Sequence, residues 1–457
     1  MTLKNSFKNS FENSVEDSFE NSIESLIKNL NSETADMRLD SLKKLSGLIK
    51  KGVIPEPKKG NDVNNHIHTF YSFSPYSPSK AIWMAYNAGL TTAGIMDHDS
   101  VGGVVEFIEA GEIIGIATTI GVECRADFSM TPLKGKKINN PDQHSIAYVA
   151  LHGIPHSKIN SVKEFFEPYK KARDKRNAIM VDRLNSMLKS YKISIDYEND
   201  VVPLSKRHEG GSITERHILF ALACKMANMF GKGEKLVDFL KNELNITMKT
   251  KIEEYLLDES NEFYEYDLLG VLKSDLLEKF YVDAKEECPP IKQLIDFSNS
   301  VGTISAYAYL GDVVDSVTGD KKSQKFEDDY LELLFDVIKQ LGFNAVTYMP
   351  SRNTIEQLKR LKSLCDKYGF FQVSGEDINS PRQPFVCIAM RNDEFRNLVD
   401  STWALIGHEK AATENLDYAM FSKYVISRYP DLNERINIYK QIGQGGSIEL
   451  LRRQVGS

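Results

Sequence analysis

The spacing of apolar and polar positions predicts alternating strands and helices between residues 61 and 395. Short apolar runs of strand length lie at 63–67, 92–96, 117–122, 145–151, 303–309, 345–349, 370–374 and 385–390. Stretches with helical spacing separate several of them, such as 79–88, which begins at a capping Ser79 and is closed by Gly89. This alternation is typical of parallel βα units. We therefore expect an α/β fold with seven or eight strands.

Helical patterns interrupt and flank this region. Residues 158–290 break the strand–helix rhythm with a long amphipathic run at 165–192 and a helix at 214–229 that Thr214 caps. We expect this insertion to lie over the mouth of the sheet. A helix at 35–51 precedes the first strand, and the residues after 393 are helical in pattern. The expected segments are 1–60, a helical extension; 61–157 and 291–395, the two parts of a barrel; 158–290, the insertion; and 396–457, a helical tail.

A repeat of period four fills residues 5–26. It places Phe7, Phe11, Val15, Phe19 and Ile23 on one stripe of a helix. Asn and Ser, which fill the positions between them, are poor helix formers. We expect an amphipathic helix that forms against a partner surface, either the barrel or a second subunit of a homo-oligomer. Disorder is the alternative.

Charge and composition exclude some classes of protein. The net charge of −7 gives no basic domain of the kind that binds nucleic acid. No apolar run reaches the 18 residues of a membrane span, and the N-terminal residues lack the apolar core of a signal peptide. The five cysteines are odd in number and widely spaced, as expected for reduced thiols in a cytoplasmic protein.

Candidate metal ligands follow three successive strands. His66 and His68 form an H-x-H on an extended chain, so their side chains point to the same side. His98, with Asp97, and then Glu123 end the next two apolar runs. Mixed nitrogen and carboxylate ligands suit zinc, iron or manganese, and a carboxylate can bridge two ions. Polar residues at strand ends are also typical of a barrel, which carries its chemistry at that rim.

These motifs resemble those of the PHP (polymerase and histidinol phosphatase) superfamily. The resemblance rests first on His66-Ile67-His68-Thr69, Asp97-His98-Asp99 and Gly121-Val122-Glu123. It continues with Thr214-Glu215-Arg216-His217 and with Ser374-Gly375-Glu376-Asp377-Ile378-Asn379. It covers roughly residues 61–395, without much of 225–290. It implies a distorted TIM-like (β/α)7 barrel.

The resemblance also implies a site and a reaction. The reaction is hydrolysis of a phosphoester of a small phosphorylated molecule at a centre of one to three divalent ions (Mn, Zn or Fe), with Asp97 and His98 as catalytic residues. One of the two histidines that flank the fourth strand is implied as a ligand, and we expect His144 rather than His152. The expected ligands are His66, His68, His98, Glu123, His144, His217 and Asp377, with Asp97, His152 and Asn379 as further candidates. His217 has an alternative interpretation as a capping or packing residue.

Some positions depart from the superfamily pattern. Asn379 stands where the closing motif normally ends in His, and the loop 70–75 carries no ligand. Arg125, Arg216 and Arg382 are candidates for binding the substrate phosphate, because a guanidinium is always charged and can donate two parallel hydrogen bonds. The alternatives are a degenerate domain that binds metal or ligand as a scaffold without turnover, and an amidohydrolase-type enzyme, which would commonly use a carboxylated lysine.

Overall fold

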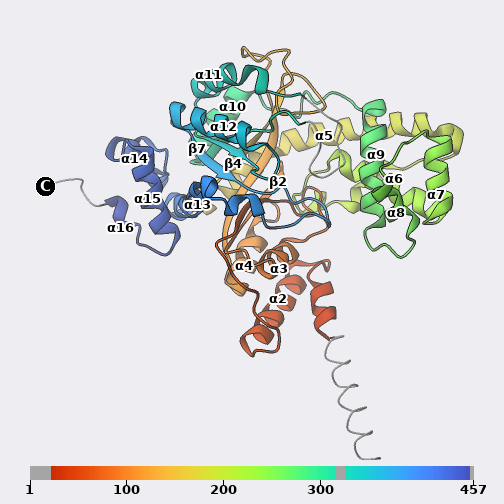
Figure 1. The fold of residues 1–457 in the computed structure, drawn as a ribbon, viewed down its shortest axis with the longest axis horizontal. Helices are drawn as coiled ribbons and strands as arrows, with labels where there is room; N and C mark the ends of the chain where they lie inside the picture. Colours follow the sequence, from red (N-terminus) through yellow and green to blue (C-terminus); the bar gives the residue numbers. More distant parts are fainter. Residues whose placement is uncertain (1–21, 314–324, 453–457) are drawn as a thin grey trace, which may run out of the picture.

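A computed structural model describes residues 22–313 and 325–452, and its centre is one seven-stranded sheet in the order β1-β2-β3-β4-β5-β6-β7. Each strand falls on one of the expected apolar runs, and β3 continues past the expected end at 122 to Asp127. The sheet curls, and helices surround it (Figure 1), so the expected α/β barrel-like class is confirmed. The strands are β1 Val63–Ile67, β2 Thr92–His98, β3 Ala117–Asp127, β4 Ile146–His152, β5 Ile304–Ala308, β6 Ala345–Tyr348 and β7 Phe371–Ser374.

One strand runs against the others. β4 is antiparallel to both β3 and β5, whereas the remaining neighbours are parallel. The expectation of parallel units throughout is wrong here. Parallel neighbours need a crossover, usually a helix, and residues 128–145 between β3 and β4 contain none. The chain therefore turns back directly beside β3.

The prediction of an eighth strand at 385–390 is wrong. Residues Ile388–Arg391 form a single 3-10 turn. Phe385 and Cys387 are buried in the main core, but Ile388 is 70% exposed. The apolar run therefore anchors a loop against the outer face of the barrel rather than adding a strand.

Helices on the outer face of the sheet complete the main core. Val63 and Ile67 of β1 pack in this core with Ile82 of α3 and Leu334 of α11. Buried Arg38 of α2 donates two hydrogen bonds to Glu106 of α4, which ties the N-terminal helix to the barrel. The outer helices are α2 Ala35–Lys50, α3 Pro78–Asn87, α4 Val104–Ile114, α10 Ile291–Val301, α11 Leu331–Leu341 and α12 Ile355–Tyr368.

The C-terminal helix α13 covers the inner face of the sheet, and the helices that follow it extend away from the sheet (Figure 1). Ala150, Ala306 and Val373 of the sheet form a core with Ala404 and Leu405 of α13. α13 also packs tightly on α15, because Gly407 and Gly443 lie at the crossing. A Cβ atom on either would come within 1.9 Å of a backbone oxygen of the other helix. These helices are α13 Arg396–Glu414, α14 Lys423–Arg428, α15 Leu432–Gly443 and α16 Glu449–Arg452.

The insertion forms a helical lobe beside the barrel, drawn in yellow and green in Figure 1. It has a core of its own, in which Leu184, Leu222 and Leu272 are buried. Phe73, from the loop after β1, belongs to the same core and joins the lobe to the barrel. The helices of the lobe are α5 Ile159–Leu188, α6 Glu215–Phe230, α7 Glu234–Asp238, α8 Thr250–Leu257 and α9 Tyr264–Phe280.

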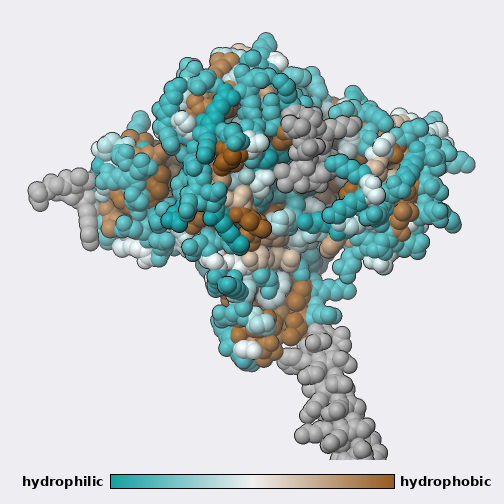
Figure 2. Space-filling view, viewed as in Figure 1, coloured by the Kyte–Doolittle hydropathy of each residue, from teal (hydrophilic) through white to brown (hydrophobic). Residues whose placement is uncertain are grey.

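Most of the face seen in Figure 2 is hydrophilic, with apolar side chains in separate small groups. None of the described helices combines the length and apolarity needed to cross a membrane. All five cysteines are free thiols. The period-four repeat lies almost wholly outside the described residues. Only its last residues are described, where 22–29 are helical.

Candidate metal centre

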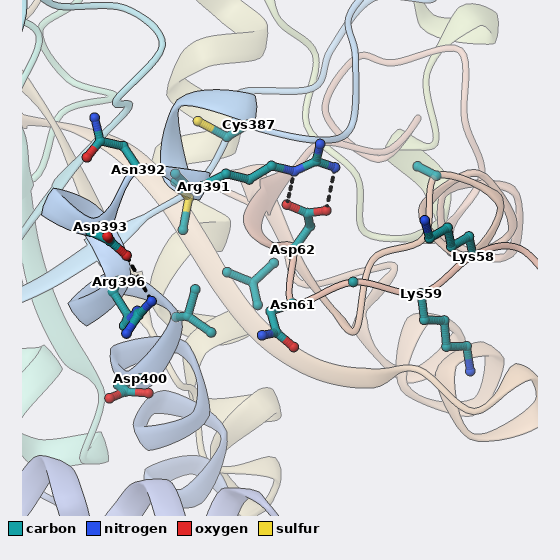
Figure 3. Close-up of a pocket in the computed structure, with 15 residues that line it drawn as sticks. Lys58, Lys59, Asn61, Asp62, Cys387, Arg391, Asn392, Asp393, Arg396 and Asp400 are labelled. Atoms are coloured by element: carbon teal, nitrogen blue, oxygen red, sulfur yellow. Dashed lines mark hydrogen bonds and ion pairs between the residues drawn. The ribbon is translucent and has the colours of Figure 1, made fainter.

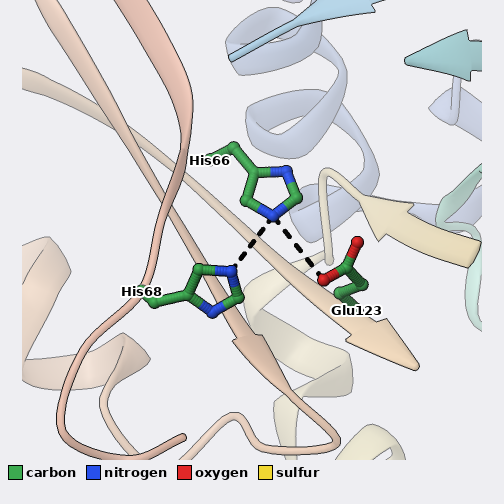
Figure 4. A group of neighbouring side chains, drawn as sticks. All are labelled: His66, His68 and Glu123. Atoms are coloured by element: carbon green, nitrogen blue, oxygen red, sulfur yellow. Dashed lines mark hydrogen bonds and ion pairs between the residues drawn. The ribbon is translucent and has the colours of Figure 1, made fainter. Parts of the chain in front are cut away.

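Three predicted ligands meet at the carboxyl end of the sheet. The facing Nε2 atoms of His66 and His68 are 3.2 Å apart, and Glu123 Oε2 lies 3.7 Å from His66 Nε2 (Figure 4). One donor atom from each of the three residues lies within 4.8 Å of the other two. The H-x-H spacing places both rings on one face of β1, and Glu123 comes from β3, two strands away. Two imidazole nitrogens and a carboxylate oxygen that converge in this way fit a divalent transition ion.

Two further predicted ligands adjoin this group. Register pairs His98 of β2 with Glu123 of β3, and His98 Nδ1 lies 3.2 Å from Glu123 Oε2. Asp377 Oδ1 lies 3.2 Å from His68 Nε2. Glu123 therefore contacts His66 and His98, whereas Asp377 contacts His68. Five of the residues assigned as ligands from the sequence are thus brought together.

Asp377 reaches this place because the segment after β7 joins β1. His68 N donates to Ile378 O at 2.9 Å, and Ile378 N donates to His66 O at 3.0 Å. These two bonds close the sheet at the end that carries the ligands. The close approach requires Gly375, since a Cβ atom there would lie 2.6 Å from His66 N.

Asp97 contacts the loop after β1 and orients His68 indirectly. Its Oδ1 accepts hydrogen bonds from Thr69 N and Ser72 Oγ, both at 2.7 Å, and its Oδ2 accepts one from Thr69 Oγ1 at 2.6 Å. Ser72 Oγ, which gives its own proton to Asp97, accepts from His68 Nδ1 at 3.2 Å. A neutral His68 would then carry its proton on Nδ1, so that Nε2 could bind an ion. The loop without ligands thus has a role that the sequence did not reveal.

Burial and neighbouring charges shift the pKa of several of these groups. Burial raises the pKa of Asp97 despite its hydrogen bonds. Burial and the nearby charges of His68 and Arg173 lower the pKa of His98 well below its ordinary value. Burial opposes ionisation of Asp377, but His68 and His66 outweigh it and hold its pKa well below its usual range. A neutral His98 and an ionised Asp377 are the forms that bind cations.

The pKa of His66 is raised, in contrast to that of His98. Burial disfavours its protonated form, but the carboxylates of Glu123, Asp377 and Asp97 outweigh burial and raise its pKa. Negative charge therefore dominates around His66. A divalent cation would compensate this charge, which also fits the donor set.

The two histidines that flank β4 are placed very differently. His152 lies on the inner face, buried, with an Nε2 that has no hydrogen-bond partner, and burial together with His66 lowers its pKa to about 3. His144 is exposed in the loop before the strand, and the structure does not bring it into the group. The inward face of β4 favours His152 instead.

His217 occupies a capping position. Its Nδ1 accepts a hydrogen bond from Thr214 N at 3.0 Å, which closes the first turn of α6. Its ring packs edge-on against Phe73, and burial lowers its pKa to about 3. Since Nδ1 is an acceptor, the neutral ring carries its proton on Nε2 and offers no lone pair there. The contacts described for His217 include none of the other predicted ligands, which agrees with the capping interpretation.

The preceding residue, Arg216, lies nearer to the predicted ligands. Its guanidinium donates to Asn379 Oδ1 and, at 3.2 Å, to Asn379 O. Asn379 Nδ2 in turn donates to Asp377 Oδ1 at 2.6 Å. The insertion therefore contacts the centre through a cation rather than through an imidazole.

The other two arginines hold structural ion pairs. Arg125 is buried and paired with Glu287 at 2.7 Å and Glu215 at 2.9 Å. Arg382 donates two bonds to Asp267 of α9 and stacks on Tyr255. Their expected contact with a substrate phosphate finds no support in these positions. The sequence cannot show this, because the partners lie more than 100 residues away, apart from Glu215, 90 residues on.

Tyr148 is a site neighbour that sequence reasoning missed. It lies on the same face of β4 as His152, and its ring centroid is 5.9 Å from that of His98. Period-two alternation back from His152 would have found it.

A surface cavity lies apart from this group. It has a volume of about 660 Å³ and is lined by Lys58, Asp62, Arg391 and Arg396 among others (Figure 3). The segment 58–63 leads into β1, whereas His66 and His68 lie at the other end of that strand. This cavity is therefore distinct from the metal centre, and its Arg391 and Asp62 are already paired.

Comparison with known proteins gives a likeness in fold. No protein-family model and no curated protein sequence matches the chain. A solved structure described as a metal-dependent phosphoesterase from Bifidobacterium adolescentis is 19% identical, with a TM-score of 0.46, and the match covers 76% of this chain and 97% of that one. An amidohydrolase from Chromobacterium violaceum, solved with bound sulfate and no metal, is 14% identical, with a TM-score of 0.45 and coverages of 71% and 90%. At these values the likenesses decide neither activity nor substrate.

Proposed function

We propose that this protein is a divalent-metal-dependent hydrolase of phosphoesters that acts on a small phosphorylated molecule. The observation that carries the proposal is the convergence of His66, His68 and Glu123 at one point, with His98 and Asp377 within 3.2 Å of members of that group. Packing alone does not explain why five donor groups from four separate parts of the sheet converge. Arg216 beside Asp377 adds a fixed positive charge that suits an anionic substrate.

The side chains have distinct roles in this proposal. His66, His68 and Glu123 would hold a divalent ion, and His98 and Asp377 would complete its ligands or hold a second one. Such ions supply Lewis acidity and a nucleophilic water at neutral pH. Ser72 and Asp97 keep the proton of His68 on Nδ1 and so leave Nε2 available. Asp97 thus acts through His68 as a positioning residue, rather than as the catalytic group expected from the sequence.

The proposal is tested by metal content and turnover together. The purified protein should carry manganese, zinc or iron, and the double variant His66→Ala/His68→Ala should lose most of it. Hydrolysis of p-nitrophenyl phosphate should stop on exhaustive chelation, return on addition of one of these ions, and be abolished in Asp377→Ala. His208→Ala, which removes an exposed histidine of the insertion, is the matched control.

Two results would contradict the proposal. Unchanged metal content in the double variant would show that His66 and His68 do not bind the metal. Firm metal binding without turnover on a broad panel of phosphoesters would favour the alternative, a degenerate domain that binds metal as a scaffold.

A further inference from the structure

Arg216, Asn379 and Asp377 form a chain of hydrogen bonds that ends at the metal centre. A guanidinium can only donate and an ionised carboxylate can only accept. The amide of Asn379 must therefore turn its oxygen to Arg216 and its nitrogen to Asp377, and this is the arrangement found. The carbonyl oxygen of Asn379, the atom that could have served as a ligand, is already taken by Arg216.

The neighbourhood holds the guanidinium in place. The guanidinium of Arg216 lies 5.7 Å from the ring centroid of Phe73. Phe73 belongs to the loop after β1 that carries no ligand. The adjacent Glu215 is paired with Arg125 and Arg176, which fixes the first turn of α6. Burial raises the pKa of Asp377, but His68 and His66 lower it, and the positive charge of Arg216 adds to their effect.

We propose that the guanidinium of Arg216 occupies the place and supplies the charge of a further metal ion beside Asp377. The centre then holds at most two ions. The same guanidinium binds the anionic phosphoryl group of the substrate; this second part rests on the proposed function. A cation cannot enter beside a fixed guanidinium without strong repulsion at short range. An anion gains a charge-assisted contact from the same group.

Ion number tests the first part without any need for turnover. The protein is equilibrated with Mn²⁺, freed of loose ions and analysed for bound manganese. We expect no more than two equivalents in the wild type, in Asn379→His and in Arg216→Ala. The double variant Arg216→Ala/Asn379→His should gain one equivalent, since only then is an imidazole present and the guanidinium absent. Three equivalents in the wild type, or a third in Asn379→His alone, would overturn the proposal.

Binding of inorganic phosphate to the Mn²⁺-loaded protein tests the second part. Arg216→Ala should weaken phosphate binding about tenfold or more, because a charge-assisted hydrogen bond is lost. Arg216→Lys should recover part of it. Arg207→Gln is the matched control, since Arg207 lies in the same insertion and is paired with Asp174 and Glu167. Unchanged phosphate binding in Arg216→Ala would overturn this part.

These outcomes are separable from failure of the proposed function. A protein that turns over no phosphoester can still show the expected ion numbers and the loss of phosphate binding in Arg216→Ala. If the double variant unfolds, as judged by its thermal transition, the counts for the wild type and Asn379→His still decide the first part.

Discussion

At the scale of single residues, Ser72 decides which nitrogen of His68 carries the proton. Its hydroxyl links His68 Nδ1 to Asp97 Oδ1. Groups of this kind, which orient a ligand without touching the ion, typically contribute about 10–100-fold to metal affinity. We therefore expect Ser72→Ala to weaken binding of Zn²⁺ or Mn²⁺ by about that factor in a metal-buffered titration.

The control for this experiment lies in the same loop. Ser74 is also buried, but its hydroxyl has no hydrogen-bond partner, so Ser74→Ala should leave the affinity unchanged. Equal effects of the two substitutions would show that the loop matters through packing alone.

We expect Glu327 to make the stability of the fold depend on pH near neutrality. It is fully buried, its Oε1 accepts from Tyr307 and from Leu310 N, and burial raises its pKa from the ordinary 4.5 to about 7. Between these values the folded protein holds a proton that the unfolded chain releases, so the free energy of unfolding falls as the pH rises through this window. The difference corresponds to about 3 kcal/mol.

Substitution by an uncharged isostere tests this pH dependence. Glu327→Gln mimics the protonated acid, so its stability should lose this component of the slope between pH 5 and 7, measured by urea unfolding across that range. Parallel slopes in the variant and the wild type would show that Glu327 does not titrate there.

The sequence could reveal those site residues that local pattern positions, but not those whose role depends on partners far away along the chain. His66 and His68 follow from period-two alternation, and His98 and Glu123 from their position at the ends of neighbouring strands. Arg125 and Arg382 look like phosphate ligands in the sequence but are paired with acidic residues 90 to 162 positions away. Local pattern cannot distinguish a free guanidinium from a paired one.

At the scale of elements, seven of the eight expected strands exist, because short apolar runs bounded by turns are a local signal. Direction is not local: β4 is antiparallel since the connection before it lacks a helix. The packing of α13 against the inner face of the sheet also could not be predicted from the apolar pattern. Its apolar residues show that it is buried, but not which surface it covers.

At the scale of the whole molecule, a buried cluster of charges attaches the insertion to the barrel. Arg125 of β3 and Arg173 and Arg176 of α5 surround Glu287, while Glu215 and Asp99 pair with the same arginines. Three guanidiniums and three carboxylates balance in a region that solvent hardly reaches. The cluster also fixes the first turn of α6 and hence the position of Arg216.

Removing the central carboxylate should therefore loosen the insertion. Glu287→Gln leaves three buried guanidiniums with two carboxylates, and breaking a buried ion pair from one side typically costs about 3–5 kcal/mol. We expect a loss of stability of that order in urea unfolding, together with faster amide exchange in residues 158–290 than in the barrel strands. Glu209→Gln is the control, because Glu209 forms its ion pair with Lys206 at the surface. If both variants unfold alike and exchange at the wild-type rate, the cluster does not hold the insertion and does not position Arg216.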